Sequence, residues 1–244
     1  MNPVAFKLFG LEVRWYGILI SVGVIIGTIL ALRESKRISI EEDTLIDLLL
    51  YAIPISLLGA RAYYVIFSWD YYKNDLIQIF NFRGGGLAIH GAIIAGIIVV
   101  VVFCRKRKVD FWEIVDICAP SLILGQAIGR WGNYINQEAY GRPTNLPWGI
   151  IIDGVKVHPT FLYESIGDFL VFLFLLWYRK NKSKVPGEVF LLYLILYSAI
   201  RFFIEGLRTD SLMMGSIRVA QLVSIIGIVA ASFYFIKRRK EKLK

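Results

Sequence analysis

Charged residues are scarce in this sequence: Asp, Glu, Lys and Arg account for only 19% of its 244 residues, whereas 57% are hydrophobic. A single soluble core of this size could not bury so much apolar side chain. The composition therefore excludes an ordinary soluble protein and predicts a membrane protein. In that setting the net charge of +9 is a topology signal, because the basic residues form short clusters beside apolar runs, and we expect no nucleic-acid partner.

Cysteine and histidine are also rare, with two residues of each type. Cys104 and Cys118 do not make a disulfide framework, and packing is the expected role of both. No Cys or His cluster has the spacing of a metal site, and no glycine-rich nucleotide loop follows a strand. We therefore expect neither a metal nor an organic cofactor. The sequence also lacks internal repeats and low-complexity linkers, so we interpret residues 1–244 as a single transmembrane domain.

Long apolar runs are what the sequence has in abundance. A membrane-spanning helix needs about 20 apolar residues. We therefore expect an all-α polytopic membrane protein with seven transmembrane helices. The predicted spans are roughly residues 15–32, 44–67, 87–104, 110–129, 158–178, 188–206 and 218–236.

The linkers between these spans alternate in charge. Seventeen of the 28 Lys and Arg residues lie in segments 33–43, 105–109, 179–187 and 237–244. Nine lie in segments 1–14, 68–86, 130–157 and 207–218. Because cytoplasmic loops carry the excess of basic residues, we expect the N-terminus outside and the C-terminus in the cytoplasm.

The linkers expected outside have patterns of their own. Residues 1–14 and 68–83 mix aromatic or apolar residues with polar ones and are too short in apolar length to span, so they are predicted to lie in the outer interface. A loop insertion is expected at about 130–157. Within it, Asp153-Gly154 separates an apolar run from an alternating run, which is typical of a two-residue β-hairpin. We expect a small external hairpin there.

Polar residues and glycines gather in one stretch, residues 125–142, GQAIGRWGNYINQEAYGR. Its four glycines allow the backbone or a ligand to approach closely. One interpretation is a capped helix end followed by a solvated loop. The other, which we favour, is a cradle for an anionic group, because the guanidinium of Arg130 or Arg142 can bind phosphate in a fork geometry.

Three further polar groups are expected in the outer halves of their spans. His90 follows glycines 84–86; a lone histidine usually packs in the interior, but an imidazole can also accept a proton at neutral pH. Arg61 must face protein or water, in a structural or a ligand-binding role. Arg201 and Glu205 are four residues apart, so they share a helix face and can form an ion pair, either to hold the bundle or to serve a site.

Other candidates are less distinct. Tyr16 is either an interfacial aromatic residue or a hydroxyl that reaches a lipid head group. Glu164, one turn after the cap-like Thr160, is a candidate buried carboxylate. Asp116 and Asp168 lie deeper, and the sequence identifies no partner for either.

This distribution bears on function. A transporter should line a path from both sides, commonly with repeats and broken helices that meet at the midplane, and neither feature is clear here. A site that opens outward and sideways to an anionic lipid head group fits better, with Arg130, Arg201 and Arg208 bringing three positive charges to one leaflet. Two alternatives remain open: a transporter or flippase for an anionic lipid, and a non-catalytic factor that binds signal peptides.

Several blocks of residues together carry a resemblance. They are GGLAIHG with His90, GRWGNYIN with Arg130 and Asn133 running on to Glu138 and Gly141-Arg142-Pro143, HPTFLYE with Glu164, and RFFIE with Arg201 and Glu205. In this order, from Tyr16 to about Arg208, the sequence resembles the phosphatidylglycerol:prolipoprotein diacylglyceryl transferase family. Ala88-Ile89 and Phe161 stand where that family often has Ser-Phe and Gln.

The resemblance implies a multi-pass enzyme of the bacterial cytoplasmic membrane, with its active site toward the outer leaflet and no cofactor. Such an enzyme moves the diacylglyceryl unit of phosphatidylglycerol to the lipobox cysteine of a prolipoprotein signal peptide, forming a thioether and releasing glycerol 1-phosphate. The site residues that the resemblance implies are His90 as base, Arg130 on the phosphate, Arg201 or Arg208 at the departing oxygen, Glu205 fixing Arg201, and Asn133, Tyr16, Tyr197, Glu138 and Gly141 in substrate binding.

Overall fold

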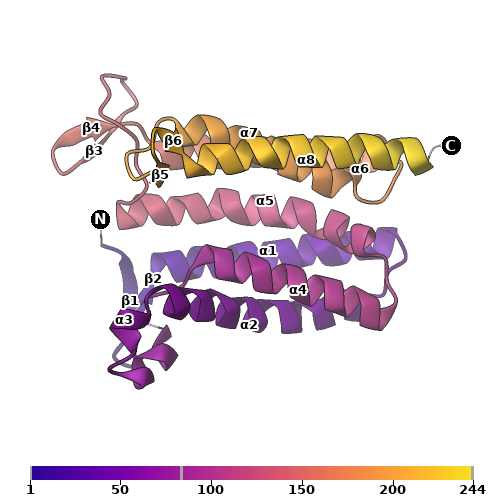
Figure 1. Ribbon diagram of the computed structural model, residues 1–244, viewed down its shortest axis with the longest axis horizontal. Coiled ribbons are helices and arrows are strands. Elements are labelled where there is room, and N and C mark those ends of the chain that lie inside the picture. The colour runs from indigo at the N-terminus through magenta and orange to yellow at the C-terminus, as the bar shows by residue number, and fades with distance from the viewer. Residues whose placement is uncertain (1, 83–84, 243–244) are drawn as a thin grey trace. The chain divides into compact units, whose positions relative to one another are not determined.

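The computed structural model describes residues 2–82 and 85–242 (Figure 1). Its helices are α1 (Trp15–Arg37), α2 (Glu42–Phe67), α3 (Trp69–Tyr72), η1 (Leu76–Phe80), α4 (Ile89–Arg107), α5 (Phe111–Asn136), α6 (Thr160–Asn181), α7 (Glu188–Glu205) and α8 (Val219–Lys242). The chain divides into two compact units, a larger one of Met1–Ala31 with Val115–Lys244 and a smaller one of Leu32–Ile114. That the chain is a single transmembrane domain stays a prediction.

Within the described residues, six helices are long and apolar enough to cross a membrane: α1, α2, α4, α5, α6 and α8. The prediction of a mostly helical polytopic protein is confirmed to that extent. The seventh predicted span, 188–206, coincides with α7, but its 18 residues include Glu188, Arg201 and Glu205, and α7 is not among the six. Seven spans, and the sides of the membrane on which the termini lie, stay predictions.

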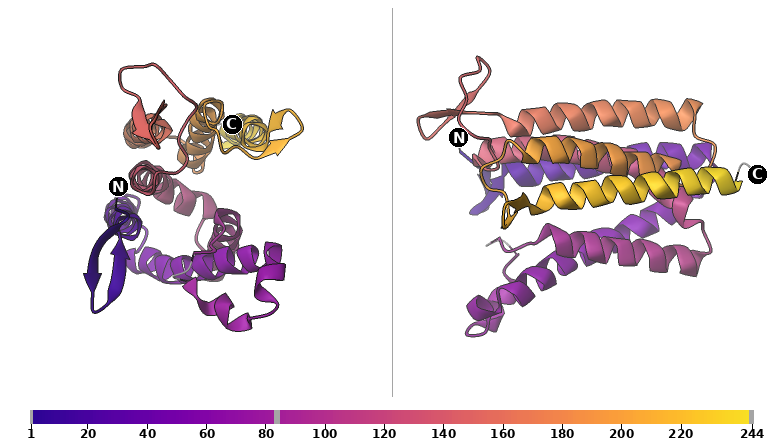
Figure 2. Two further views of the ribbon diagram at one scale, coloured as in Figure 1. Left: turned by 90° about the vertical axis from the view of Figure 1, so that its left-hand side faces the viewer. Right: turned by 45° about the horizontal axis from the view of Figure 1, so that its top comes forward.

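The core of the larger unit lies where α5, α6 and α7 meet. In that unit α7 lies between α6 and α8 (Figure 2). Fully or nearly buried apolar side chains join the elements, among them Ile123 of α5, Leu175 of α6 and Val189 of α7. The core thus holds the three helices that carry the unit's unusual charged residues in a fixed arrangement.

Small residues bring α1 close to α5. A Cβ atom added to Gly23 would lie 3.5 Å from the Cα atom of Gly125, and one added to Gly27 would lie 3.2 Å from Cβ of Ser121. The Ser121 hydroxyl donates a hydrogen bond of 2.8 Å to the Gly27 carbonyl. Small residues at a helix interface let two backbones approach closely in a membrane. Gly125, the first glycine of residues 125–142, therefore serves helix packing.

The predicted external hairpin is present as β3 (Ile150–Ile152) and β4 (Val155–Val157), with antiparallel pairing. Its two turn residues, Asp153 and Gly154, both have positive φ, at 48° and 79°, as a type I′ turn requires. Two hairpins that the sequence analysis did not predict accompany it: β1 (Val4–Leu8) with β2 (Leu11–Arg14), and β5 (Met213–Met214) with β6 (Ile217–Arg218). The β1–β2 hairpin lies in a segment predicted only as interfacial.

In the smaller unit, α2 packs against α4. The contact is close at Gly59, where an added Cβ atom would lie 2.8 Å from the carbonyl oxygen of Gly91. The predicted interfacial segment 68–83 contains α3 and η1; Arg83 and Gly84 lie outside the described residues. Whether this segment lies on the membrane surface stays a prediction.

Candidate active site

Glu164 lies between two arginines that come from different helices. Its Oε1 atom is 2.6 Å from Nη2 of Arg130 on α5, and its Oε2 atom is 3.6 Å from Nη1 of Arg201 on α7. The carboxylate is 2% exposed, as the candidate buried carboxylate of the sequence analysis required. A buried charge is tolerated when it is paired. One turn of α6 therefore brings together two arginines that are 71 residues apart in the sequence.

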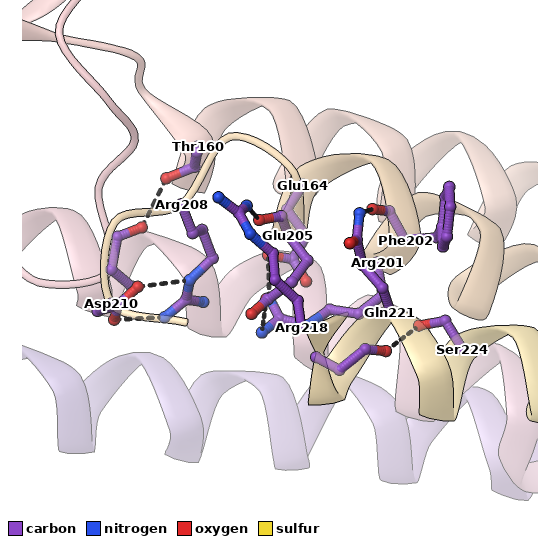
Figure 3. Close-up of polar contacts among 12 residues, drawn as sticks. Thr160, Glu164, Arg201, Phe202, Glu205, Arg208, Asp210, Arg218, Gln221 and Ser224 are labelled. Carbon is purple, nitrogen blue, oxygen red and sulfur yellow. Dashed lines mark hydrogen bonds and ion pairs between the residues drawn. The ribbon is translucent and has the colours of Figure 1, made fainter. Parts of the chain in front are cut away.

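The predicted ion pair between Arg201 and Glu205 is confirmed. Nη2 of Arg201 lies 2.6 Å from Oε2 of Glu205, one helical turn along α7, and the Glu205 side chain is almost fully buried. Arg218, the last residue of β6 and the residue before α8, donates a hydrogen bond to the backbone carbonyl of Glu205 (Figure 3). This hydrogen bond links the C-terminal end of α7 to the residue that precedes α8.

Some polar atoms of this cluster make no hydrogen bond in the described part of the chain. They are Nε of Arg130, Nη1 of Arg201, Oε2 of Glu205, and both carboxylate oxygens of Asp168, which lies one turn after Glu164 on α6. Leaving a buried donor or acceptor unsatisfied costs about 1–3 kcal/mol. The cluster is therefore electrostatically paired but has unused hydrogen-bonding capacity, and both arginine side chains remain about one fifth exposed.

The C-terminal end of α5 carries a second polar group. Asn133 and Asn136 each donate a side-chain hydrogen bond to Oε1 of Glu138, at 3.0 and 3.2 Å. Oδ1 of Asn133 is 3.5 Å from Nη1 of Arg130, so Asn133 links Glu138 to the arginine cluster. The structure shows that this stretch ends a helix beside a charged cluster; that the cluster holds an anionic group stays a prediction.

Gly141 lies where three segments meet. Its N–H donates to the carbonyl of His158, and the N–H of Arg142 donates to the carbonyl of Leu207, at 3.0 and 2.8 Å. A Cβ atom at Gly141 would be 2.7 Å from Cβ of His158. Only a glycine fits this junction, which ties the loop after α5 to the segment that carries Arg208. Thr160, predicted as a cap, instead donates to the carbonyl of Ala139.

Arg208 has its own partner. Its guanidinium forms a two-point contact with the carboxylate of Asp210, with Nη2–Oδ2 and Nε–Oδ1 distances of 2.6 and 2.8 Å (Figure 3). This hydrogen-bonded guanidinium lowers the pKa of Asp210 below its usual value. Arg208 thus differs from Arg130 and Arg201, whose carboxylate partners are almost fully buried.

Two predicted tyrosines lie beside the cluster's helices. The ring of Tyr16 fills the space beside Gly132, because a Cβ atom there would lie 2.1 Å from Cδ2 of Tyr16. Tyr197 precedes Arg201 by one turn of α7 and stacks on Tyr193, with ring centroids 6.0 Å apart. Both therefore belong to the larger unit that contains Arg130, Arg201 and Glu205.

His90 belongs to the smaller unit, in the first turn of α4. Its side chain is exposed, and its ring centroid lies 5.9 Å from that of Tyr63. Over residues 2–82 and 85–242 the imidazole has no hydrogen-bond partner. Its part in the chemistry stays a prediction.

Arg61, also in the smaller unit, has a structural environment. Its guanidinium is buried, and its N–H groups donate to five backbone carbonyls, those of Gln78, Ile79, Asn81, Gly85 and Gly86, and to the hydroxyl of Tyr72. A guanidinium has five N–H donors, so none is left for a ligand. Of the two roles that the sequence left open, the structure supports pairing within the protein.

Comparisons with known proteins agree with one another. The sequence model of the Prolipoprotein diacylglyceryl transferase family matches residues 3–237. The chain is 56% identical over 244 residues to a protein of Finegoldia magna, covering 100% of this chain and 98% of that protein. It is 53% identical over 246 residues to a protein of Clostridioides difficile, covering 100% and 99%. Both relatives are named phosphatidylglycerol–prolipoprotein diacylglyceryl transferase.

Proposed function

The chain belongs to the prolipoprotein diacylglyceryl transferase family, and from that membership we infer that it is an enzyme that transfers the diacylglyceryl group of phosphatidylglycerol to a prolipoprotein. In finer detail, the acceptor is the thiol of the lipobox cysteine in the signal peptide. The products are a thioether-linked prolipoprotein and glycerol 1-phosphate. The enzyme works in the bacterial cytoplasmic membrane with its site toward the outer leaflet, which the distribution of Lys and Arg supports.

One observation carries this proposal most directly: Arg130 and Arg201 converge on Glu164 while Nε of the first and Nη1 of the second make no hydrogen bond. Charged residues within apolar spans are costly, pair with one another or face a water-filled cavity, and commonly mark a functional site. Two guanidinium groups with unused donors suit a phosphodiester, which has two non-bridging oxygens.

The transfer is a displacement at carbon. The sulfur of the acceptor cysteine attacks the glycerol carbon of the diacylglyceryl unit that bears the phosphodiester. The C–S bond forms as the C–O bond breaks, and the bonding electrons leave on the phosphate oxygen of glycerol 1-phosphate. The thiol must lose its proton, because the thiolate is the nucleophile. His90 takes this proton in our proposal, and its exposed imidazole, without a hydrogen-bond partner in the described residues, supports that role.

The arginines have different roles at the phosphate. Arg130 holds the phosphate in the ground state, and Arg201 or Arg208 stabilises the negative charge that develops on the departing oxygen. Glu205 fixes Arg201, as their 2.6 Å ion pair supports. The leaving group thus needs no metal or organic cofactor in this scheme.

The remaining residues orient the lipid head group. Asn133 and Glu138 form a hydrogen-bonded pair at the end of α5, and Tyr16 and Tyr197 offer hydroxyl groups from α1 and α7. Gly141 contributes by holding the junction from which Arg208 projects. These assignments follow the family resemblance and are compatible with the positions of the side chains in the larger unit.

The deciding experiment measures transfer of label from glycerol- or acyl-labelled phosphatidylglycerol to a synthetic lipobox peptide by the purified protein. We expect label on the peptide and release of glycerol phosphate, with no transfer to a Cys→Ser peptide or by Arg130→Ala protein. Folded protein that binds the lipid but labels none of several lipobox peptides would contradict the transferase, and lipid transport would then be the function to measure.

A further inference from the structure

Glu164 joins two arginines, yet the roles above assign it nothing. We propose that Glu164 is a positioning residue: it holds Arg130 and Arg201 together so that one phosphate group can bind both. The proposal rests on the proposed function, because it assumes that a phosphate-bearing lipid is the donor. It adds a residue of α6 to a site otherwise assigned, within the larger unit, to residues of other segments.

Charge balance is the first reason. Two guanidinium groups that converge in an apolar bundle repel one another, and a buried carboxylate between them offsets that repulsion. Glu164 is 2% exposed and contacts one guanidinium with each of its oxygens. Glu205 already pairs with Arg201, but without Glu164 the guanidinium of Arg130 would lose its 2.6 Å ion-pair partner and would move away from Arg201 or turn toward solvent before a lipid arrived.

The two contacts of Glu164 are unequal, and the difference fits a positioning role. Arg130 is held closely, at 2.6 Å, whereas Arg201 is 3.6 Å away and has its short contact with Glu205. Glu164 therefore fixes Arg130 as Glu205 fixes Arg201. The longer contact of Glu164 with Arg201 keeps the two guanidinium groups near each other but uses none of the N–H donors of Arg201.

The unused donors are the second reason. Nη2 of Arg130 donates a hydrogen bond to Glu164, and Nη2 of Arg201 forms an ion pair with Glu205, while Nε of Arg130 and Nη1 of Arg201 make no hydrogen bond in the part of the chain that the structure describes. Each donor left unsatisfied costs free energy that an incoming acceptor recovers. In the proposed complex, one non-bridging oxygen of the phosphodiester accepts a hydrogen bond from each arginine.

A different role for Glu164 makes the opposite prediction. If the carboxylate merely occupied the phosphate position until substrate displaced it, neutralising Glu164 would tighten lipid binding and lower KM. A positioning carboxylate predicts weaker binding and slower transfer when its charge is lost. The direction of the change therefore separates the two roles.

The test measures kcat and KM for phosphatidylglycerol, together with equilibrium binding of labelled phosphatidylglycerol, for wild type, Glu164→Gln and Glu164→Asp. We expect kcat/KM to fall about 10- to 100-fold in Glu164→Gln, since small misplacements of catalytic groups have effects of this size. The matched control is Glu188→Gln, another buried glutamate, which contacts Arg239 at the opposite end of α7 from Glu205. It should stay within about threefold of wild type.

A double-mutant cycle distinguishes positioning from general support of the fold. Because Glu164 acts through the fork of Arg130, Glu164→Gln should add little to the loss already caused by Arg130→Lys. Fully additive losses, a wild-type rate in Glu164→Gln, or a lowered KM would each overturn the proposal. If Glu164→Gln does not accumulate as folded protein, Glu164→Asp keeps the charge, and the shortened side chain should still lower kcat/KM.

Failure of the proposed function would look different. In that case wild-type protein would transfer no label to any lipobox peptide, whatever residue stands at position 164. The binding measurement would still test Glu164, because weaker phosphatidylglycerol binding by Glu164→Gln than by Glu188→Gln does not depend on turnover.

Discussion

Arg61 on the one hand, and the pair Arg130 and Arg201 on the other, are stabilised in opposite ways. Arg61 is surrounded by neutral acceptors, five backbone carbonyls and the hydroxyl of Tyr72, and all its donors are used. Arg130 and Arg201 are paired with carboxylates, and each keeps a nitrogen without a hydrogen bond in the described residues. A saturated guanidinium holds a fold together, whereas a charge-balanced but unsaturated one can still bind an anion.

The difference follows from what each partner supplies. Backbone carbonyls accept hydrogen bonds but do not neutralise the positive charge. Arg61 therefore links α2 to the segment 78–86, and none of its N–H donors is left for a ligand. Carboxylates neutralise charge with few hydrogen bonds, so Arg130 and Arg201 can stay mostly buried while Nε of the first and Nη1 of the second make no hydrogen bond in the described residues. Saturation of donors, more than burial, therefore separates the structural arginine from the functional pair.

The largest expected effect is on activity, from Arg130→Lys. Lysine keeps the charge but cannot reproduce the guanidinium fork, so kcat/KM for phosphatidylglycerol should fall about 10²- to 10³-fold, the size seen when one donor to a developing charge is lost. Label transfer to a lipobox peptide measures it. The thermal unfolding midpoint in detergent should change little.

Arg37→Lys is the matched control for this change. Arg37 also donates two N–H groups to a carboxylate, that of Glu34 at the end of α1, but it has no proposed part in transfer. It should keep near-normal kcat/KM. Equal losses in both variants would show that any guanidinium-to-ammonium change disturbs the enzyme, and the phosphate clamp at Arg130 would be abandoned.

Arg61→Lys should show the reverse pattern. One ammonium group has three donors and cannot reach five carbonyls, so we expect the free energy of unfolding to fall by about 2–4 kcal/mol as hydrogen bonds to a charged group are lost. Activity per folded molecule should change only a few-fold. Denaturation in detergent and transfer assays on the folded fraction measure the two quantities. Normal stability with abolished turnover would break the distinction between the two kinds of arginine.

Gly132→Ala tests whether Tyr16, which lies beside Gly132 on α5, contacts the lipid head group. The added methyl group would meet the ring of Tyr16 and turn it away from α5, so we expect kcat/KM to fall about tenfold if the hydroxyl orients the head group. Gly129→Ala is the control one turn earlier, because its Cβ atom would make only an ordinary 3.7 Å contact with Ile20. Indistinguishable kinetics of the two variants would remove Tyr16 from the site.

Local spacing made part of this site predictable. Arg201 and Glu205 are one helical turn apart, and their ion pair is confirmed. The hairpin at Asp153-Gly154 is confirmed for a similar reason, since a two-residue turn has a sequence signature. The Phe9-Gly10 turn between β1 and β2 lacks an Asn or Asp at its first position, and that hairpin was missed.

Contacts between distant segments were not predictable in the same way. Glu164 was recognised as a candidate buried carboxylate, but nothing local pairs it with Arg130, 34 residues earlier. The sequence identifies no partner for Asp116, and the structure supplies two, the N–H groups of Gly187 and Phe190 at the start of α7. The signal available for both was general: a carboxylate within an apolar span must find a partner.

The smallest expected effect is on stability, from loss of the ion pair between Arg208 and Asp210. Arg208 is intermediate between Arg61 and the pair Arg130 and Arg201, because its partner is a carboxylate that is partly exposed. Its carboxylate partner, Asp210, is about half exposed, so solvent screens the pair, and Asp210→Asn should lower the free energy of unfolding by no more than about 1 kcal/mol. The hydrogen bond from Arg208 lowers the pKa of Asp210 in the folded protein. The pair's contribution is therefore complete above the ordinary aspartate pKa of about 4 and is lost as pH falls through the lower folded value. Unfolding midpoints measured from pH 7 down to about 3 should converge for wild type and Asp210→Asn. A gap that stays constant with pH would mean that Asp210 acts through shape, and that Arg208 is held by its backbone junction at Gly141 rather than by charge.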